Sequence, residues 1–188
     1  TLGYFAIGIK ELPQTYVSST SSHPSTEIAI EGTIDQVILK VEVVATGNYN
    51  PLLVSNIQFS TNGTTNAADI ANARLYYTGT TDEFATTSLV GANIPTPSGE
   101  FNINPNQVMA DGINYFWLVY DISNTATNLN VIDAEVLSIT VGGEVKTPTV
   151  TAPDGNRVIR TRLAGIYTVG VGGNYTTITA AVSDLNNL

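Results

Sequence analysis

The side chains that could carry out chemistry are few and scattered along the chain. The only histidine, His23, lies in the stretch TSSHPST, and there is no cysteine. Thiol catalysis, disulfides and thiolate metal sites are therefore excluded, and no histidine spacing predicts zinc. We interpret His23 as an ordinary residue of a serine-rich loop. The carboxylates offer more candidates, in three groupings: Asp82 with Glu83, Asp133 with Glu135, and Asp69.

Two of these groupings have a spacing that a known chemistry uses. On one strand, Asp133 and Glu135 would share a face about 6 to 7 Å apart, within the range of a glycosidase pair. We interpret them as outward-facing acids of an ordinary strand. The stretch TGTTDEF (78–84) is a weak candidate for structural calcium, without EF-hand spacing. We therefore predict no catalytic residues, no cofactor-binding residues and no resident metal.

The aromatic residues could contact sugars instead. Trp117, the single tryptophan, lies in the apolar stretch YFWLVY, so we expect it to be buried. Tyr76 and Tyr77 are neighbours on a predicted strand, so one should point inward and one outward. An outward tyrosine would suit a glycan contact. The stretch VGVGGNY (169–175) fails every glycine-rich phosphate motif.

Composition limits the partners. The chain has 188 residues, 16 acidic and 7 basic, with a net charge of −9. Such a surface repels nucleic acid and anionic lipid, and no apolar run is long enough for a membrane helix. Only 12% of the residues are charged, and Thr, Asn, Ser and Gly fill the polar positions, which is typical of a secreted or cell-surface β-protein. Because the sequence begins with Thr1 and has no leader pattern, we expect a processed or excised piece of a longer protein.

Periodicity predicts an all-β fold, an antiparallel β-sandwich or jelly roll of about ten strands. In the stretch DQVILKVEVVATG, four residues share one face (Val37, Leu39, Val41 and Val43), while Lys40 and Glu42 take the other. Residues 113–122 are apolar on both faces and suit a central strand. Turns are expected at Asn62-Gly63 and Gly142-Gly143, and NAADIANA (66–73) is expected to form one or two helical turns capped by Asn66.

The pattern divides the chain into three parts. Residues 1–13 form an apolar strand, residues 14–162 the sandwich, and residues 163–188 a short strand-plus-helix extension that begins a second domain or packs as a tail. The apolar side chains of the two outer parts are candidate assembly contacts: Phe5, Ile7 and Ile9 in the first, and Ile178, Val182 and Leu185 in the second.

Two long stretches carry a family resemblance over roughly residues 15–160. ILKVEVVATGNYNPLLVSNIQFSTNGTTNAADIANARLYYTGTTDEFAT and GINYFWLVYDISNTATNLNVIDAEVLSITVGGEVKTPTVTAPDGNRVI are similar to the sialidase N-terminal-associated domain. The resemblance implies a β-sandwich module ahead of a BNR-repeat propeller, in secreted or surface proteins of Bacteroidota-type bacteria, many exported by type IX secretion. It also implies that catalysis belongs to the propeller, whose S-x-D-x-G-x-T-W repeats are absent here.

The last stretch has a resemblance of its own. YTVGVGGNYTTITAAVSDL looks like the beginning of a right-handed parallel β-helix of the pectin-lyase-like kind. There, a strand and an amphipathic helix cap the end of the stack. The resemblance implies that the helix opens a second domain.

Three functions remain open from the sequence. The first is a non-catalytic accessory module that spaces or docks neighbouring domains. The second is a subunit of an extracellular fibre or adhesin, in which residues 1–10 add a strand to a neighbouring copy. The third is a glycan-binding module with contacts from Tyr76 and Tyr77.

Overall fold

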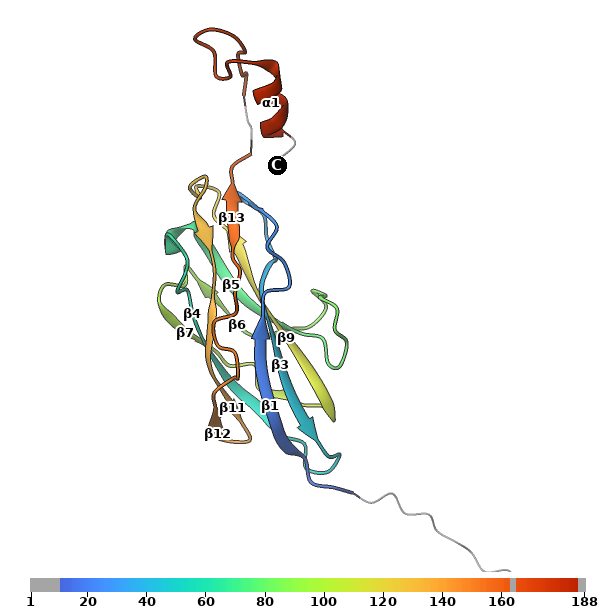
Figure 1. Ribbon diagram of the computed structural model, residues 1–188. Helices are drawn as coiled ribbons and strands as arrows, with labels where there is room; N and C mark the ends of the chain where they lie inside the picture. The colour runs from blue at the N-terminus through green and yellow to red at the C-terminus, as the bar shows by residue number, and fades with distance from the viewer. Residues whose placement is uncertain (1–10, 163–164, 186–188) are drawn as a thin grey trace, which may run out of the picture.

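The computed structural model describes residues 11–162 and 165–185, which form a two-layered β-sandwich followed by a small helical extension (Figure 1). The all-β prediction is confirmed. Thirteen strands lie in the described residues, more than the ten or so predicted, because two-residue strands leave no periodic signal. The elements are β1 (Thr15–Ser22), β2 (Ala29–Ile30), β3 (Gln36–Thr46), β4 (Leu53–Ser60), η1 (Ala67–Asp69), β5 (Ile70–Tyr77), β6 (Leu89–Pro95), β7 (Glu100–Ile103), β8 (Gln107–Val108), β9 (Gly112–Ile122), β10 (Val131–Ile132), β11 (Glu135–Val141), β12 (Glu144–Lys146), β13 (Arg157–Arg160) and α1 (Ile178–Leu185).

Two five-stranded sheets make the layers. The first sheet has the order β1-β3-β9-β5-β6, and the second has the order β12-β11-β4-β7, with β8 also paired to β4. All pairs within these two sheets are antiparallel. A third, small sheet, β10-β13-β2, contains a parallel pair between β13 and β2.

Strand β9 lies at the centre of the first sheet, as its two apolar faces predict. Phe116, Leu118 and Tyr120 point into the core between the layers and are fully buried. The alternate residues belong to a separate cluster on the outer face, which includes Tyr115 and Trp117. The first sheet therefore carries buried apolar residues on both faces, and its outer face needs a cover of its own.

One face assignment in β3 was wrong. Leu39, Val41 and Val43 point into the core as predicted, but Val37 packs against the outer cluster. The pairing of β3 with β9 shifts register between Val37 and Leu39. A bulge of one residue reverses the inward and outward positions that precede it.

The predicted turns are confirmed, and the segment expected to form one or two helical turns capped by Asn66 forms one. Gly63, Gly142 and Gly143 have φ values of 86°, 59° and 86°, in the left-handed region that glycine adopts without strain. Asn66 caps a 3₁₀ turn of only three residues. Strand β5 begins directly afterwards, because Ile70 pairs with Ile122 of β9 and sheet pairing outweighs a weak helical preference.

A buried arginine, Arg157, stabilises the small sheet through hydrogen bonds. Arg157 is 7% exposed and donates four hydrogen bonds, to the carbonyls of Glu27, Ile28 and Val37 and to Oε1 of Gln36, at 2.8–3.1 Å. None of these acceptors is a carboxylate, and burial lowers the pKa of the Arg157 guanidinium. The contacts join β13 to the residues just before β2 and to the beginning of β3.

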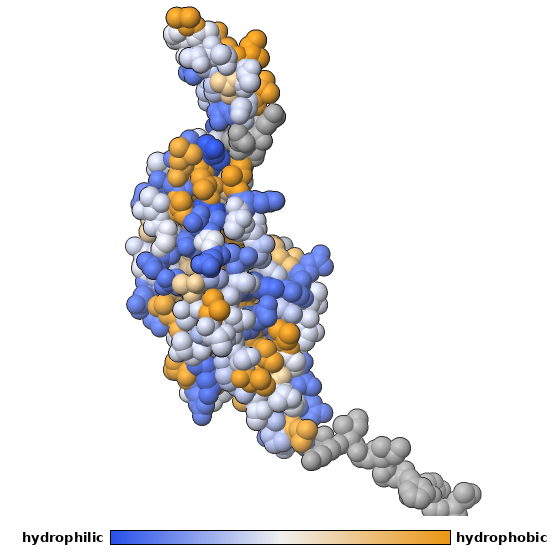
Figure 2. All heavy atoms as spheres, in the orientation of Figure 1, coloured by the Kyte–Doolittle hydropathy of each residue, from blue (hydrophilic) through white to orange (hydrophobic). Residues whose placement is uncertain are grey.

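The chain enters and leaves the sandwich at opposite ends. Strand β1 begins at one end, β13 finishes at the other, and α1 lies beyond β13 (Figure 1). Helix α1 buries none of its own residues, and apolar side chains gather on the surface of this extension (Figure 2). The predicted strand at residues 1–10 lies outside the described residues.

Candidate functional site: a cavity within the loop that joins β5 to β6

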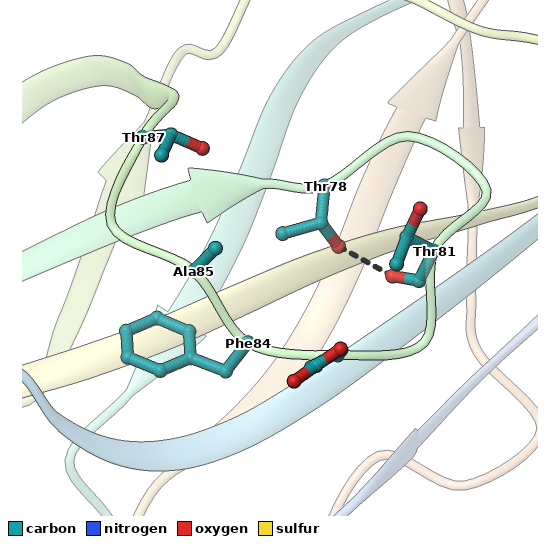
Figure 3. A pocket seen from close by; sticks show the side chains of 6 residues that line it. Thr78, Thr81, Phe84, Ala85 and Thr87 are labelled. Atoms are coloured by element: carbon teal, nitrogen blue, oxygen red, sulfur yellow. Dashed lines mark hydrogen bonds between the residues drawn. The ribbon is translucent and has the colours of Figure 1, made fainter.

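A cavity of about 380 Å³ lies within the loop between β5 and β6. A single stretch of chain folds around the hollow, and side chains from both halves of the stretch border it (Figure 3). The lining combines hydroxyl groups, a carboxylate and a phenyl ring, and consists of Thr78, Thr81, Glu83, Phe84, Ala85 and Thr87.

Hydrogen bonds close the two ends of the loop. The N–H of Tyr77 donates to the carbonyl of Ser88 at 2.9 Å. Within the loop, Oγ1 of Thr78 donates to the carbonyl of Thr81 at 2.7 Å (Figure 3), and the N–H of Thr81 donates back to the carbonyl of Thr78 at 3.2 Å. These contacts hold the loop in a closed turn around the hollow.

An aromatic cluster on the outer face of the first sheet forms the base of the loop. The ring of Phe84 lies edge-on to Tyr76, with centroids 5.7 Å apart, and 5.9 Å from Trp117. Trp117 is buried as predicted, with 4% exposed, although it lies in this outer cluster and not between the layers. Its Nε1–H donates to Oγ1 of Thr78 at 2.8 Å, so the loop and the cluster are bonded directly.

An ion-pair network anchors the loop to β3. Nζ of Lys40 lies 2.9 Å from Asp82 and 3.0 Å from Glu42, and above the rings of Tyr115 and Trp117. Burial would lower the pKa of Lys40, but its hydrogen bonds to both carboxylates outweigh burial and raise that pKa. The lysine charge is therefore matched by two acids.

Three polar groups of the lining remain unpaired. In the part of the chain that the structure describes, the hydroxyls of Thr81 and Thr87 and the carboxylate of Glu83 make no hydrogen bond to protein. The hydroxyls can donate or accept, and the carboxylate can accept two hydrogen bonds. The loop thus offers free hydrogen-bonding groups beside a partly exposed phenyl ring.

The tyrosines proposed for glycan contact are covered. Tyr76 is 4% exposed, and its hydroxyl donates to Asp35 at 2.9 Å. Tyr77 is partly buried on Phe116 and donates to Asn114 at 2.6 Å. Burial raises the pKa of both phenols. As predicted, one tyrosine points outward and one inward: Tyr76 lies in the outer cluster and Tyr77 packs against the core. The outward tyrosine is not exposed, because Phe84 covers it.

A polar network adjoins the aromatic cluster on the same face. The Arg74 guanidinium pairs with Asp35 and Asp121. Asn72 donates to Asp121 at 3.1 Å. These side chains bond to one another and stabilise the sheet face, although Nε of Arg74 is buried without a hydrogen-bond partner in the described residues.

The other predicted acids are engaged in structural contacts. Asp133 lies between β10 and β11, outside any strand, so the expectation that it shares a strand face with Glu135 was wrong. Glu135 accepts a hydrogen bond from Asn62 at 2.7 Å. Asp69 is buried and accepts hydrogen bonds from Thr127 and Asn130. No group of three or more potential metal-binding side chains occurs in the described residues.

The histidine is not the loose loop residue that the sequence suggested. The side chain of His23 is 2% exposed, and Nε2 lies 2.9 Å from Oδ1 of Asp133. Gly155 packs against the same ring, where an added Cβ would come within 3.3 Å of it. In the described residues neither ring nitrogen has a partner that meets hydrogen-bond geometry, so the interaction with Asp133 is a close charge contact of a buried ring.

The extension carries the remaining predicted contacts. Ile178, Val182 and Leu185 of α1 are 73%, 46% and 58% exposed. Together with the exposed Ile166 and Val171, they leave an apolar surface with no described partner. Phe5, Ile7 and Ile9 lie outside the described residues, so their role stays a prediction.

Comparison with known proteins identifies the sandwich. Residues 18–145 match the family described as the N-terminal domain of BNR-repeat neuraminidase. The chain belongs to this family. The predicted resemblance is thereby confirmed for the sandwich, while the resemblance of the extension to a β-helix stays a prediction.

Solved structures support the fold of this neuraminidase-associated domain. The Hadza microbial sialidase Hz136 superimposes with a TM-score of 0.60 at 17% identity, over 74% of this chain and 31% of that chain. The domain thus corresponds in fold to about a third of a larger sialidase. No curated protein matches the sequence. The eight-residue helix α1 is too short to cross a membrane, and the described residues hold no other candidate span.

Proposed function

We propose that this domain is a non-catalytic module of a larger secreted or cell-surface protein, which holds the domains on either side of it at a fixed separation. The observation that carries the proposal is the path of the chain, which enters the sandwich at one end and leaves at the other (Figure 1). Exposed apolar residues flank both points, Leu12 and Tyr49 at the first and Leu129 near the second. A module of this shape separates its neighbours by its own length.

The chemistry of the side chains supports a non-catalytic role. Asp69, Asp82, Asp133 and Glu135 each accept a hydrogen bond from a protein group. His23 is buried. General acid–base catalysis needs a group within hydrogen-bonding reach of a substrate, and these groups are already committed to the fold.

The spacer role can be tested by single-molecule energy transfer. Because the chain has no cysteine, Glu11→Cys and Arg162→Cys give two specific dye positions near the two ends. We expect one narrow distance distribution that persists until the domain unfolds. A broad distribution in native buffer would refute a rigid spacer. In the same preparation we expect no turnover of a fluorogenic sialoside, and turnover abolished by Asp133→Asn would refute the non-catalytic assignment.

A second candidate function is carbohydrate binding at the β5–β6 loop. The cavity there joins unpaired hydroxyls and a carboxylate to a phenyl ring, a combination suited to the polar edge and apolar face of a sugar. Of the contacts proposed from the sequence, Tyr76 would then act only by supporting Phe84, and Tyr77 would have no part because it packs on Phe116 on the core side. Phe84→Ala should abolish glycan binding measured by calorimetry, whereas Tyr49→Ala, which removes an exposed ring elsewhere, should not.

Assembly of copies is supported only by the apolar surface of the extension. Strand addition through residues 1–10 would produce open head-to-tail chains. Light scattering on the full chain and on a chain lacking residues 1–12 tests this alternative. Assemblies that collapse to monomers on deletion would support it, and monomers in both cases would refute it.

A further inference from the structure

We infer that the β5–β6 loop cavity binds neutral pyranose sugars and rejects sugars that carry a carboxylate, sialic acid among them. The inference rests on the carbohydrate-binding function proposed above and specifies its ligand. It follows from the charges around the cavity and from the hydrogen-bonding groups that remain free in its lining.

The electrostatics of the cavity are negative. Glu83 lines the hollow, and Asp82 and Glu42 lie on either side of Lys40. Lys40 is the only cation that forms an ion pair with a loop residue in the described part of the chain, and both of these carboxylates already pair with it. A sialic acid carboxylate would therefore meet an unpaired like charge and no free cation, and like charges in contact disfavour binding.

The free groups suit a polyol. The Glu83 carboxylate can accept two hydrogen bonds from neighbouring sugar hydroxyls, and hydrogen bonds to a charged acceptor are the stronger kind. The hydroxyls of Thr81 and Thr87 can complete a donor and acceptor set around the ring. Phe84 supplies apolar contact, since its position is fixed by Tyr76 and Trp117.

The dimensions agree with a small ligand. A volume of about 380 Å³ falls at the lower end of ligand pockets, which span about 300–1,000 Å³. One or two sugar rings fit this range. Calcium is a poorer match, because it takes six to eight oxygen ligands, usually including several carboxylates, and Glu83 is the only unpaired carboxylate in the lining.

Lactose and 3′-sialyllactose are the matched probes, because they differ by one sialic acid. We expect calorimetry at low salt to show that lactose binds at least about tenfold more tightly than 3′-sialyllactose. A tenfold ratio of dissociation constants corresponds to one unfavourable charge contact of about 1.4 kcal/mol. Glu83→Gln keeps the shape of the side chain and removes its charge. The ratio of the two dissociation constants should then fall to about threefold or less, because 3′-sialyllactose should bind more tightly relative to lactose. Glu100→Gln, the same change on β7 away from the cavity, should leave the ratio unaltered.

The outcomes distinguish a failure of the charge selectivity from a failure of carbohydrate binding itself. If neither probe binds the full chain, carbohydrate binding and the inference both fail. If 3′-sialyllactose binds as tightly as lactose, or if Glu83→Gln leaves the ratio unchanged, the charge selectivity is wrong and carbohydrate binding stands. If chelation by EDTA abolishes lactose binding, a bound cation occupies the negative site, and the assignment of Glu83 as a direct sugar acceptor is overturned.

Discussion

Replacing Thr78 with valine should destabilise the domain by about 2 kcal/mol. The hydroxyl of Thr78 accepts from Nε1 of Trp117 and donates to the carbonyl of Thr81. Valine fills the same volume without the hydroxyl, so the buried indole N–H loses its partner. An unsatisfied buried donor costs about 1–3 kcal/mol. The carbonyl of Thr81 adds little, because Thr81 is exposed and water can replace its donor.

Denaturant unfolding measures this loss directly. Circular dichroism follows the whole domain, and the fluorescence of Trp117, the single tryptophan, follows the site. The midpoint should fall with an unchanged m-value, and the melting temperature should drop by about 4–8 °C, because 1 kcal/mol shifts a domain of this size by about 2–4 °C.

Two control variants test whether the loss of stability comes from the hydrogen bond to Trp117. Thr78→Ser keeps the hydroxyl and should cost less than about 1 kcal/mol, the value of one buried methylene. Thr87→Val makes the same chemical change in the same loop, at a hydroxyl without a protein partner, and should stay within about 0.5 kcal/mol of the native domain. Equal losses for Thr78→Val and Thr87→Val would refute the hydrogen-bond argument, as would a loss for Thr78→Ser equal to that for Thr78→Val.

Three further predictions concern the cations and the core. Arg157→Met should lower the free energy of unfolding by about 3 kcal/mol, measured by calorimetry. Four charged hydrogen bonds are lost, and this loss is offset in part because the guanidinium no longer has to be desolvated. A decrease of less than about 1 kcal/mol would contradict this. Burial raises the pKa of Tyr120 in the folded domain. The stability that this buried phenol contributes is therefore fully present below pH 10, where the phenol of the unfolded chain also stays protonated. Above pH 10 the stability should fall by about 1.4 kcal/mol per pH unit from this group, and urea titrations of Tyr120→Phe should show a shallower decline. Asp82→Asn should cost less than about 1 kcal/mol, since the pair with Lys40 is partly exposed, and an effect that persists in 1 M NaCl would argue against an ionic origin.

The strands could be predicted from the sequence because their burial follows a period of two. Strand β9 was recognised as central from apolar residues on both faces, and Leu39, Val41 and Val43 were placed correctly on the core face. The bulge that turns Val37 outward leaves no mark in the pattern of apolar and polar residues. Register shifts of this kind depend on the pairing of two strands, which a single strand's sequence does not encode.

The environments of the polar residues were harder to predict than the strands. His23 lies in a serine-rich stretch, as an exposed loop would, yet its side chain is 2% exposed and lies against Asp133, 110 positions later. Asp133 and Glu135 have strand-like spacing, but the chain leaves β10 before Asp133 and begins β11 at Glu135. In each case a long-range contact decided the environment, and local periodicity carries no information about such contacts.

The candidate site combines a part that was predictable with a part that was not. The burial of Trp117 followed from its strand, whereas its place on the outer face required a cover that only the β5–β6 loop provides through Phe84. The same cover that hides Tyr76 creates the cavity, since the loop must arch from Thr78 over the sheet and return to Ser88. The loop is therefore constrained by the aromatic cluster beneath it, on which Phe84 packs, and this path of the chain places Thr81, Glu83 and Thr87 around the cavity. The fold thus sets where Glu83 lies relative to Phe84, and the charge selectivity proposed for Glu83 depends on that placement.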